Sequence, residues 1–136
     1  MDERKMSGFL GTYTVSLDDK GRLNVPAKFK NVLEESYGPH IVTVVMEDYL
    51  VVFPASEWEE NEKLYKDRSA LSPTDRDAMR QYYARASECE IKSGKILVPQ
   101  FQREATGLNK EVVIVGMSST FEIWDSDRWA KNGPGR

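Results

Sequence analysis

The sequence predicts an α+β fold, mainly β, in which two related halves combine into one small barrel with the helices outside. Three observations lead to this prediction. The chain has 136 residues, so each half would have only a thin core by itself. The stretch from Gly21 to Pro26 is echoed from Gly94 to Pro99, and the stretch 46–58 is echoed at 117–129. Two echoes in the same order indicate an internal duplication of a β-β-α-β-β unit.

The two copies are expected to share one core. Each copy has two hairpins and one short helix, too little to close a core alone. Copies related by a pseudo-two-fold axis can interleave their hairpins, which buries both apolar faces and removes most sheet edges. We expect one structural unit, with a first repeat and its following helix over residues 8–66, a helical linker over 67–84 and a second repeat over 85–130. No ordered structure is expected for residues 131–136.

The first repeat opens with an alternating strand over residues 12–17. Tyr13, Val15 and Leu17 lie on one face of this strand. A turn over 18–21 follows, in which Gly21 can adopt positive φ without steric cost. The other elements predicted here are a return strand over 22–25, a helix over 27–35 that begins after Pro26, and a hairpin with strands over 41–46 and 50–53.

Two capping signals then predict two helices. Ser56 with Glu59 forms a capping box for a helix over 57–66, and Ser72 before Pro73 begins a helix that reaches residue 84. The pattern of the first repeat then restarts. Its predicted elements are strands over 87–91 and 95–98, a helix from Pro99 to 106 that Gly107 ends, a hairpin with strands over 110–116 and 120–124, and a terminal turn capped by Asp125 or Ser126.

Charge is unevenly distributed along the chain. The formal net charge is −3, which by itself disfavours nucleic acid as a partner. Four cations and no acid lie between Lys20 and Lys30, whereas seven acids and four cations lie between Pro54 and Met79. A segregated charge distribution lets one face bind a polyanion while the total stays negative.

Side chains suited to catalysis or metal binding are scarce. His40, the single histidine, is expected in a surface loop with no partner for proton transfer. Cys89, the single cysteine, lies in a strand pattern and is expected in the core. No Cys/His cluster has metal-ligand spacing, and no Gly-rich phosphate loop occurs. We therefore predict no enzymatic activity, no metal and no cofactor.

Two cationic turns at equivalent places in the two repeats are the best candidates for function. A single turn of this kind is usually only solvated, but two in a pseudo-symmetric unit would project together as a basic surface. Arginine reads guanine in the major groove, lysine neutralises phosphate, and a two-stranded β-ribbon fits that groove. The sequence therefore predicts a site for double-stranded DNA, formed by Lys20, Gly21, Arg22, Lys28, Lys92 and Lys95.

The segment 17–26, with Ser87-Glu88-Cys89 before the second copy and the segment 121–125 after it, resembles the MraZ family of bacterial transcriptional regulators. The resemblance runs from about Gly8 to Trp129. It implies a swapped-hairpin barrel related to the AbrB and MazE DNA-binding folds, and ring-shaped homo-oligomers. It also implies binding to tandem G-rich repeats upstream of the family's own division and cell-wall operon. Carried over by position, Lys20 and Arg22 belong to the DNA-contacting surface.

The hallmark of that family is one Asp-x-x-x-Arg motif in each repeat. The first motif is intact from Asp18 to Arg22. In the second copy Ile91 stands four residues before Lys95, so the acid is missing, lysine replaces arginine, and the turn is one residue shorter. We expect Arg22 to carry sequence reading and Lys95 to hold phosphate only.

The basic turns predict DNA binding, and the resemblance implies that the protein is a sequence-specific repressor of its own operon. Its expected partners are operator DNA and further copies of itself, with no small-molecule substrate and no membrane. No long uncharged apolar run occurs, so we expect a cytoplasmic, nucleoid-associated protein. An alternative of another class stays open, in which an antitoxin-like or oligomeric scaffold recruits a protein partner through the acidic helical stretch that begins at Ser56.

Overall fold

The computed structural model describes residues 8–66 and 72–133, which form eight strands and five helices. The predicted α+β class is confirmed. The elements in chain order are β1 Thr12–Ser16, β2 Arg22–Asn24, α1 Ala27–Ser36, β3 His40–Met46, β4 Tyr49–Pro54, α2 Ala55–Lys66, α3 Pro73–Ala84, β5 Ala86–Glu90, β6 Lys95–Leu97, α4 Gln100–Thr106, β7 Glu111–Gly116, β8 Phe121–Asp125 and α5 Ser126–Asn132. None of the described helices is long and apolar enough to cross a membrane.

The strands form one six-stranded sheet and one two-stranded sheet. The order of the larger sheet is β1-β7-β8-β4-β3-β5, and the smaller sheet pairs β2 with β6. Every pairing between the two halves is antiparallel, and it joins β1 to β7, β2 to β6, β3 to β5 and β4 to β8. The counterparts in the two halves are β1 and β5, β2 and β6, β3 and β7, and β4 and β8. Exchanging each strand for its counterpart gives the same order of the larger sheet, counted from its other edge. The interleaving of two equivalent halves therefore follows from the strand pairing itself.

The predicted small barrel does not close. β1 and β5 form the two edges of the larger sheet, and the β2–β6 ribbon is a separate sheet. Between β1 and β2 the described structure has one isolated bridge, Leu17 to Leu23, and after β5 it has the bridge Lys92 to Lys95. β2 and β6 have three residues each, and beyond these single bridges neither of them extends a ladder to β1 or β5.

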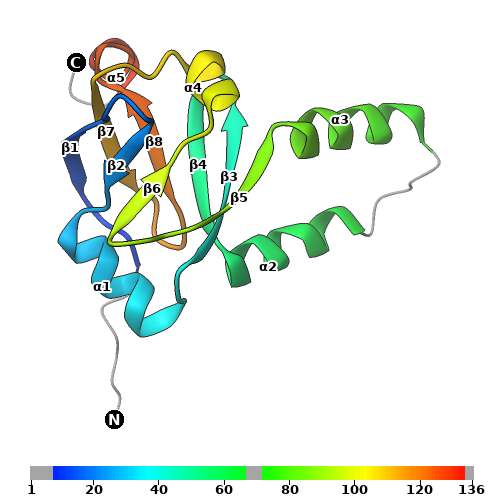
Figure 1. The fold of residues 1–136 in the computed structure, drawn as a ribbon. Coiled ribbons are helices and arrows are strands. Elements are labelled where there is room, and N and C mark those ends of the chain that lie inside the picture. Colours follow the sequence, from blue (N-terminus) through cyan, green and yellow to red (C-terminus); the bar gives the residue numbers. More distant parts are fainter. Residues whose placement is uncertain (1–7, 67–71, 134–136) are drawn as a thin grey trace.

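The main core lies between the larger sheet and the ribbon, with α1 and α4 beside it (Figure 1). Its centre is aromatic. Phe9 contacts Phe29 and Phe121 with ring centroids 5.1 and 4.9 Å apart, and all three side chains are at most 1% exposed. Because Phe9 comes from the lead-in, Phe29 from α1 and Phe121 from β8, these rings join the two halves through one apolar cluster.

Helices α2 and α3 project to one side of the sheets (Figure 1). Their bases cover the reverse face of β3 and β4 through a second apolar cluster. In this cluster Trp58 stacks on Tyr82 with centroids 5.5 Å apart and meets Phe53 edge-on at 5.3 Å. The acidic stretch of the sequence is therefore attached to the sheet opposite the face that packs against the ribbon.

Most predicted boundaries agree with the structure to within two residues, and the local exceptions have clear causes. Ser72 caps α3 by accepting from the Asp75 backbone N–H at 3.3 Å, as predicted, but Ser56 lies inside α2, which begins at Ala55. His40 is exposed at the start of β3 and is not in a loop, because it pairs with Glu90 of β5.

The chain end also differs from the prediction. Helix α5 extends to Asn132, so Lys131 and Asn132, expected to lack order, are helical. Residues 134–136 of that predicted segment lie outside the described residues. Part of the predicted linker over 67–84, residues 67–71, likewise lies outside the description, whereas its remainder from Pro73 to Ala84 is α3.

Candidate nucleic-acid interface

The β2–β6 ribbon has two chemically different faces. Its inner face is formed by Leu23 and Ile96, which are paired in register and are 1% and 0% exposed. Its outer face carries two cross-strand pairs, Arg22 with Leu97 and Asn24 with Lys95. The inner pair fastens the ribbon to the core, so the outer face points to solvent with a fixed set of four side chains. This arrangement is a narrow two-stranded ribbon with cations on its free face.

The two predicted turns lie at opposite ends of this ribbon, not side by side. The first turn precedes Arg22 in β2 and the second precedes Lys95 in β6, and the two strands are antiparallel. Two further backbone hydrogen bonds hold these ends, from Val25 N–H to the Gly94 oxygen at 2.9 Å and from Val98 N–H to the Gly21 oxygen at 2.8 Å. The predicted basic surface is therefore one ribbon face with a turn at each end.

Asp18 anchors Arg22 within the first turn. One carboxylate oxygen, Oδ1, accepts from the backbone N–H groups of Lys20 at 2.9 Å and Arg22 at 2.8 Å. The other, Oδ2, accepts from Arg22 Nε at 2.9 Å. Because only Nε is used, the terminal nitrogens of the guanidinium stay available as a bidentate donor. The side chains of Arg22 and Asp18 are 46% and 41% exposed, so the pair lies at the surface.

The same contacts lower the pKa of Asp18 below its ordinary value of 3.8. The largest cause is the hydrogen bond from the Arg22 backbone N–H, which partial desolvation opposes; the Arg22 side chain and the Lys20 N–H lower the pKa further. A carboxyl group with a lowered pKa in the folded state stabilises the fold above pH 3.8. This contribution disappears as the pH falls through the lowered folded value.

We therefore expect Asp18→Asn to be less stable than wild type at pH 6, and this difference to shrink towards zero as the pH falls below 3.8. Asparagine keeps an oxygen acceptor for the two backbone N–H groups but loses the charge. The measurement is the urea midpoint of both proteins at pH 6 and pH 3. Asp19→Asn is the matched control, since Asp19 is exposed in the same turn and accepts none of the hydrogen bonds described above. A pH-independent difference for Asp18→Asn would contradict the anchoring role of the charge.

The second turn has a different construction. It is a two-residue loop closed by Lys92 and Lys95, whose backbone groups hydrogen-bond each other at 2.9 and 3.2 Å. Ser93 and Gly94 both have positive φ, +52° and +72°, the pattern of a tight hairpin turn. This loop is one residue shorter than the first, so Lys92 occupies the place that Asp18 has in the first turn. Counting back four residues from Lys95 had pointed to Ile91 instead. A cation thus stands where the first repeat has its anchoring acid.

Lys95 is tied to the first repeat. Its Nζ donates to Asn24 Oδ1 at 3.0 Å across the ribbon. Lys95 and Lys92 also line one hollow with Arg22, together with the acids Glu88 and Glu90 of β5. The structure therefore brings three of the predicted cations to one region and places two carboxylates beside them.

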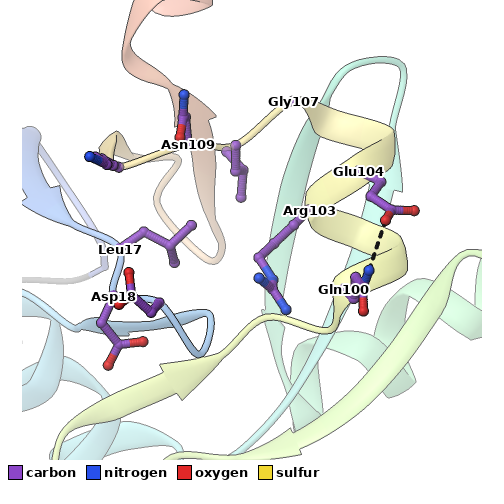
Figure 2. Close-up of a pocket in the computed structure, with 10 residues that line it drawn as sticks. Leu17, Asp18, Gln100, Arg103, Glu104, Gly107 and Asn109 are labelled. Atoms are coloured by element: carbon purple, nitrogen blue, oxygen red, sulfur yellow. Dashed lines mark hydrogen bonds between the residues drawn. The ribbon is translucent and has the colours of Figure 1, made fainter.

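Gly21 is buried, and the atoms that leave no room for a side chain here belong to the protein itself. A Cβ at this position would lie 2.7 Å from Arg103 Nε and 2.8 Å from the Val98 oxygen. Arg103 reaches from α4 towards the turn that carries Asp18, where both line a hollow (Figure 2). Gly21 therefore shapes the turn and does not itself present a surface to a ligand.

Sequence reasoning missed two cations that flank the turns. Arg103 donates from Nε to the Val98 oxygen at 3.1 Å, beside the first turn. Lys30 of α1 occupies the equivalent place at the second turn, where its Nζ would lie 2.9 Å from a Cβ at Gly94. Lys30 and Arg103 stand at equivalent positions of the two repeats, and this match in the sequence could have identified both as site residues. Of the remaining predicted residues, Lys20 is exposed in the first turn and Lys28 is exposed in the first turn of α1.

No group of three or more His, Cys, Asp or Glu side chains in the described part of the chain is arranged to hold a metal ion. Cys89 is half-buried against the main core and not fully inside it.

Comparison with known proteins gives a consistent result. The family model described as "MraZ protein, putative antitoxin-like" matches residues 9–81 and 82–132. The chain is 41% identical over 123 residues to the "Transcriptional regulator MraZ" of Nitrosospira multiformis, covering 89% of this chain and 84% of the relative. It is 38% identical over 122 residues to the protein of that name in Syntrophobacter fumaroxidans, covering 89% and 81%. The Yersinia pestis protein of that name is 38% identical over 124 residues, covering 89% and 82%.

Proposed function

Because the chain belongs to the MraZ family of transcriptional regulators, we propose that it binds double-stranded DNA sequence-specifically through the outer face of the β2–β6 ribbon. The family consists of regulators and not of enzymes. We further propose that the protein represses its own division and cell-wall operon by binding tandem G-rich repeats upstream of it, at the nucleoid. One observation carries the proposal: an arginine held by an ion pair on the free face of a ribbon narrow enough for the major groove.

Each predicted site residue has a role in this proposal. Arg22 reads guanine through its terminal nitrogens, because Asp18 already engages Nε. Lys20, Lys28, Lys92 and Lys95 contribute positive charge towards phosphates, and Gly21 lets the first turn form. The negative total charge is compatible with DNA binding because α2, the helix that carries four acids, packs through its base on the face of β3 and β4 opposite the ribbon.

We propose that copies of the chain assemble into a ring that presents several ribbons to tandem sites. Simultaneous engagement would raise the overall affinity far above that of one ribbon. The swapped-hairpin relationship to the AbrB and MazE folds stays a prediction, supported by the pairing of β2 with β6 across the halves. Light scattering on the DNA-free protein measures the assembly, and a monomer at the concentrations used for DNA binding would contradict the ring.

Fluorescence anisotropy with DNA from upstream of the gene tests the main proposal. We expect wild type to bind this fragment about a thousandfold more tightly than a shuffled duplex of equal length, at physiological salt. Equal binding to the two duplexes would contradict sequence-specific reading. Absence of binding to either, combined with recovery of a stoichiometric protein partner in a pull-down, would favour a scaffold or antitoxin-like module instead.

The scaffold alternative has less support from the contacts of α2. Three of the four acids on this helix already have partners within the chain: Tyr37 donates to Glu57 at 2.7 Å, Lys63 to Glu60 at 2.9 Å, and Tyr83 to Glu62 at 3.1 Å. A partner that used these carboxylates would first have to displace the contacts.

Lys95→Ala is expected to weaken DNA binding without changing its sequence preference. Loss of one phosphate contact should reduce the slope of log K against log salt by about 1 for each engaged ribbon, equally on specific and shuffled DNA. The measurement is an anisotropy titration at several salt concentrations. Lys63→Ala is the matched control, because Lys63 is an exposed cation on α2, away from the ribbon. A lost preference between bases with an unchanged salt slope would instead make Lys95 a base reader.

A further inference from the structure

Leu97 is an exposed apolar side chain on an otherwise polar face. It is 51% exposed on the outer face of the ribbon, where its neighbours are Arg22, Asn24 and Lys95. Single exposed leucines are common on protein surfaces, so the exposure of Leu97 does not by itself indicate a binding site. The position of Leu97 does indicate one, because Leu97 is the direct cross-strand partner of Arg22, the arginine proposed to read guanine.

The two ends of the ribbon differ, although the fold relates them by a pseudo-two-fold axis. This axis exchanges Arg22 with Lys95 and Asn24 with Leu97, as the register of β2 and β6 requires. One end therefore presents a guanidinium beside an isobutyl group. The other presents an ammonium hydrogen-bonded to an amide oxygen at 3.0 Å. A ribbon with unlike ends distinguishes the two directions of a DNA strand, which a symmetric ribbon cannot do.

The spacing on the ribbon is nearer to one base-pair step than to two. Side chains directly opposite each other on antiparallel strands have Cβ atoms about 5 Å apart. Successive bases along a strand are about 3.4 Å apart. If the terminal nitrogens of Arg22 bind O6 and N7 of a guanine, Leu97 lies over an adjacent base pair. The apolar group that a base pair offers in the major groove is the C5-methyl group of thymine.

We propose that Leu97 contacts the 5-methyl group of a thymine adjacent to the guanine bound by Arg22, and so makes the ribbon read a two-base step in one direction. This proposal rests on the proposed DNA-binding function. The contact removes apolar surface of both partners from water, which favours binding. Asn24 cannot replace it at the equivalent place, because its amide oxygen accepts from Lys95.

Deoxyuridine provides the test, since it pairs as thymine does but lacks the methyl group. The experiment compares upstream DNA in which thymines are replaced by deoxyuridine, first uniformly and then one at a time, with the unmodified fragment. Wild type should bind the uniformly substituted DNA about fivefold more weakly for each ribbon engaged, and one position per repeat should account for the loss. Leu97→Ala should bind both DNAs equally, at the affinity wild type shows for the substituted one.

Controls separate this proposal from the function on which it rests. Leu64→Ala removes another exposed leucine, 68% exposed on α2, and should keep the wild-type response to deoxyuridine. Equal binding of wild type to both DNAs, with binding still dependent on Arg22, would overturn the thymine contact and leave the proposed function intact. An equal loss in wild type and Leu97→Ala would also overturn it, because another group would then read the methyl. Absence of any Arg22-dependent binding would remove the proposed function and this proposal together.

Discussion

Arg22→Ala is expected to lower affinity for the upstream DNA about 100-fold or more, and affinity for shuffled DNA much less, by the loss of one positive charge. A bidentate arginine–guanine contact discriminates by about 1–3 kcal/mol, and a ring that engages several tandem sites multiplies the loss. The side chain is 46% exposed and its ion pair with Asp18 lies at the surface, so the substitution should not impair folding. The measurement is anisotropy with both duplexes at one salt concentration, alongside a thermal melt.

Arg22→Lys is the sharper control for this prediction. Lysine keeps the positive charge but has no planar pair of donors, so non-specific binding and its salt dependence should persist while the preference for upstream DNA is lost. Full recovery of specificity by lysine would mean that residue 22 acts as a charge only. Unchanged specific binding by Arg22→Ala would exclude Arg22 as the base-reading residue.

Gly21→Ala is expected to destabilise the fold by roughly 3 kcal/mol. Gly21 has φ +89°, a conformation in which a Cβ is strained. The new Cβ would also lie 2.8 Å from the Val98 backbone oxygen and 2.7 Å from Arg103 Nε. Neither atom moves easily, because Val98 N–H donates to the Gly21 oxygen and Arg103 Nε donates to the Val98 oxygen. The measurement is the free energy of unfolding from urea titration.

Gly94→Ala at the equivalent position is the matched control. Its φ of +72° is close to the left-handed region that other residues can occupy, and the nearest atom to the new Cβ is the flexible end of Lys30. We expect a loss of about 1 kcal/mol, from backbone strain alone. Similar losses at both glycines would show that contact with Val98 and Arg103 contributes little at the first turn. A loss of specific DNA binding by folded Gly21→Ala would further connect the turn to the placement of Arg22.

The candidate site could be predicted from the sequence in its components but not in its arrangement. Lys20, Arg22, Lys92 and Lys95 stand out because turn residues, cations and alternating apolar residues are local patterns. Their arrangement depends on the register between β2 and β6, which are separated by about half the chain. The pseudo-two-fold relation between the repeats led to the expectation that the two turns project together as one basic surface. In the structure each arm pairs with a strand of the other half, so the tips lie at the two ends of one ribbon.

The burial of individual residues could not always be predicted from the sequence either. Gln102 has the sequence context of an ordinary polar helix residue, yet it is fully buried. Its Nε2 donates to the backbone oxygens of Thr43 and Arg85 at 3.0 and 2.9 Å, and its Oε1 accepts from the Thr43 hydroxyl at 2.8 Å. These partners come from other elements, so only the packed structure could satisfy the amide and permit its burial.

The sequence by itself determined that the chain is a duplicated β-β-α-β-β unit, that its helices and strands lie close to where they were predicted, and that one repeat carries the intact Asp18-to-Arg22 motif. These features follow from periodicity, capping and turn chemistry over a few neighbouring residues. The tertiary structure alone decided that the barrel stays open, that Lys92 takes the place of Asp18, and that Leu97 stands opposite Arg22. Each of these depends on pairing between distant strands, whose register is determined by the burial of Leu23 against Ile96 and not by the local sequence.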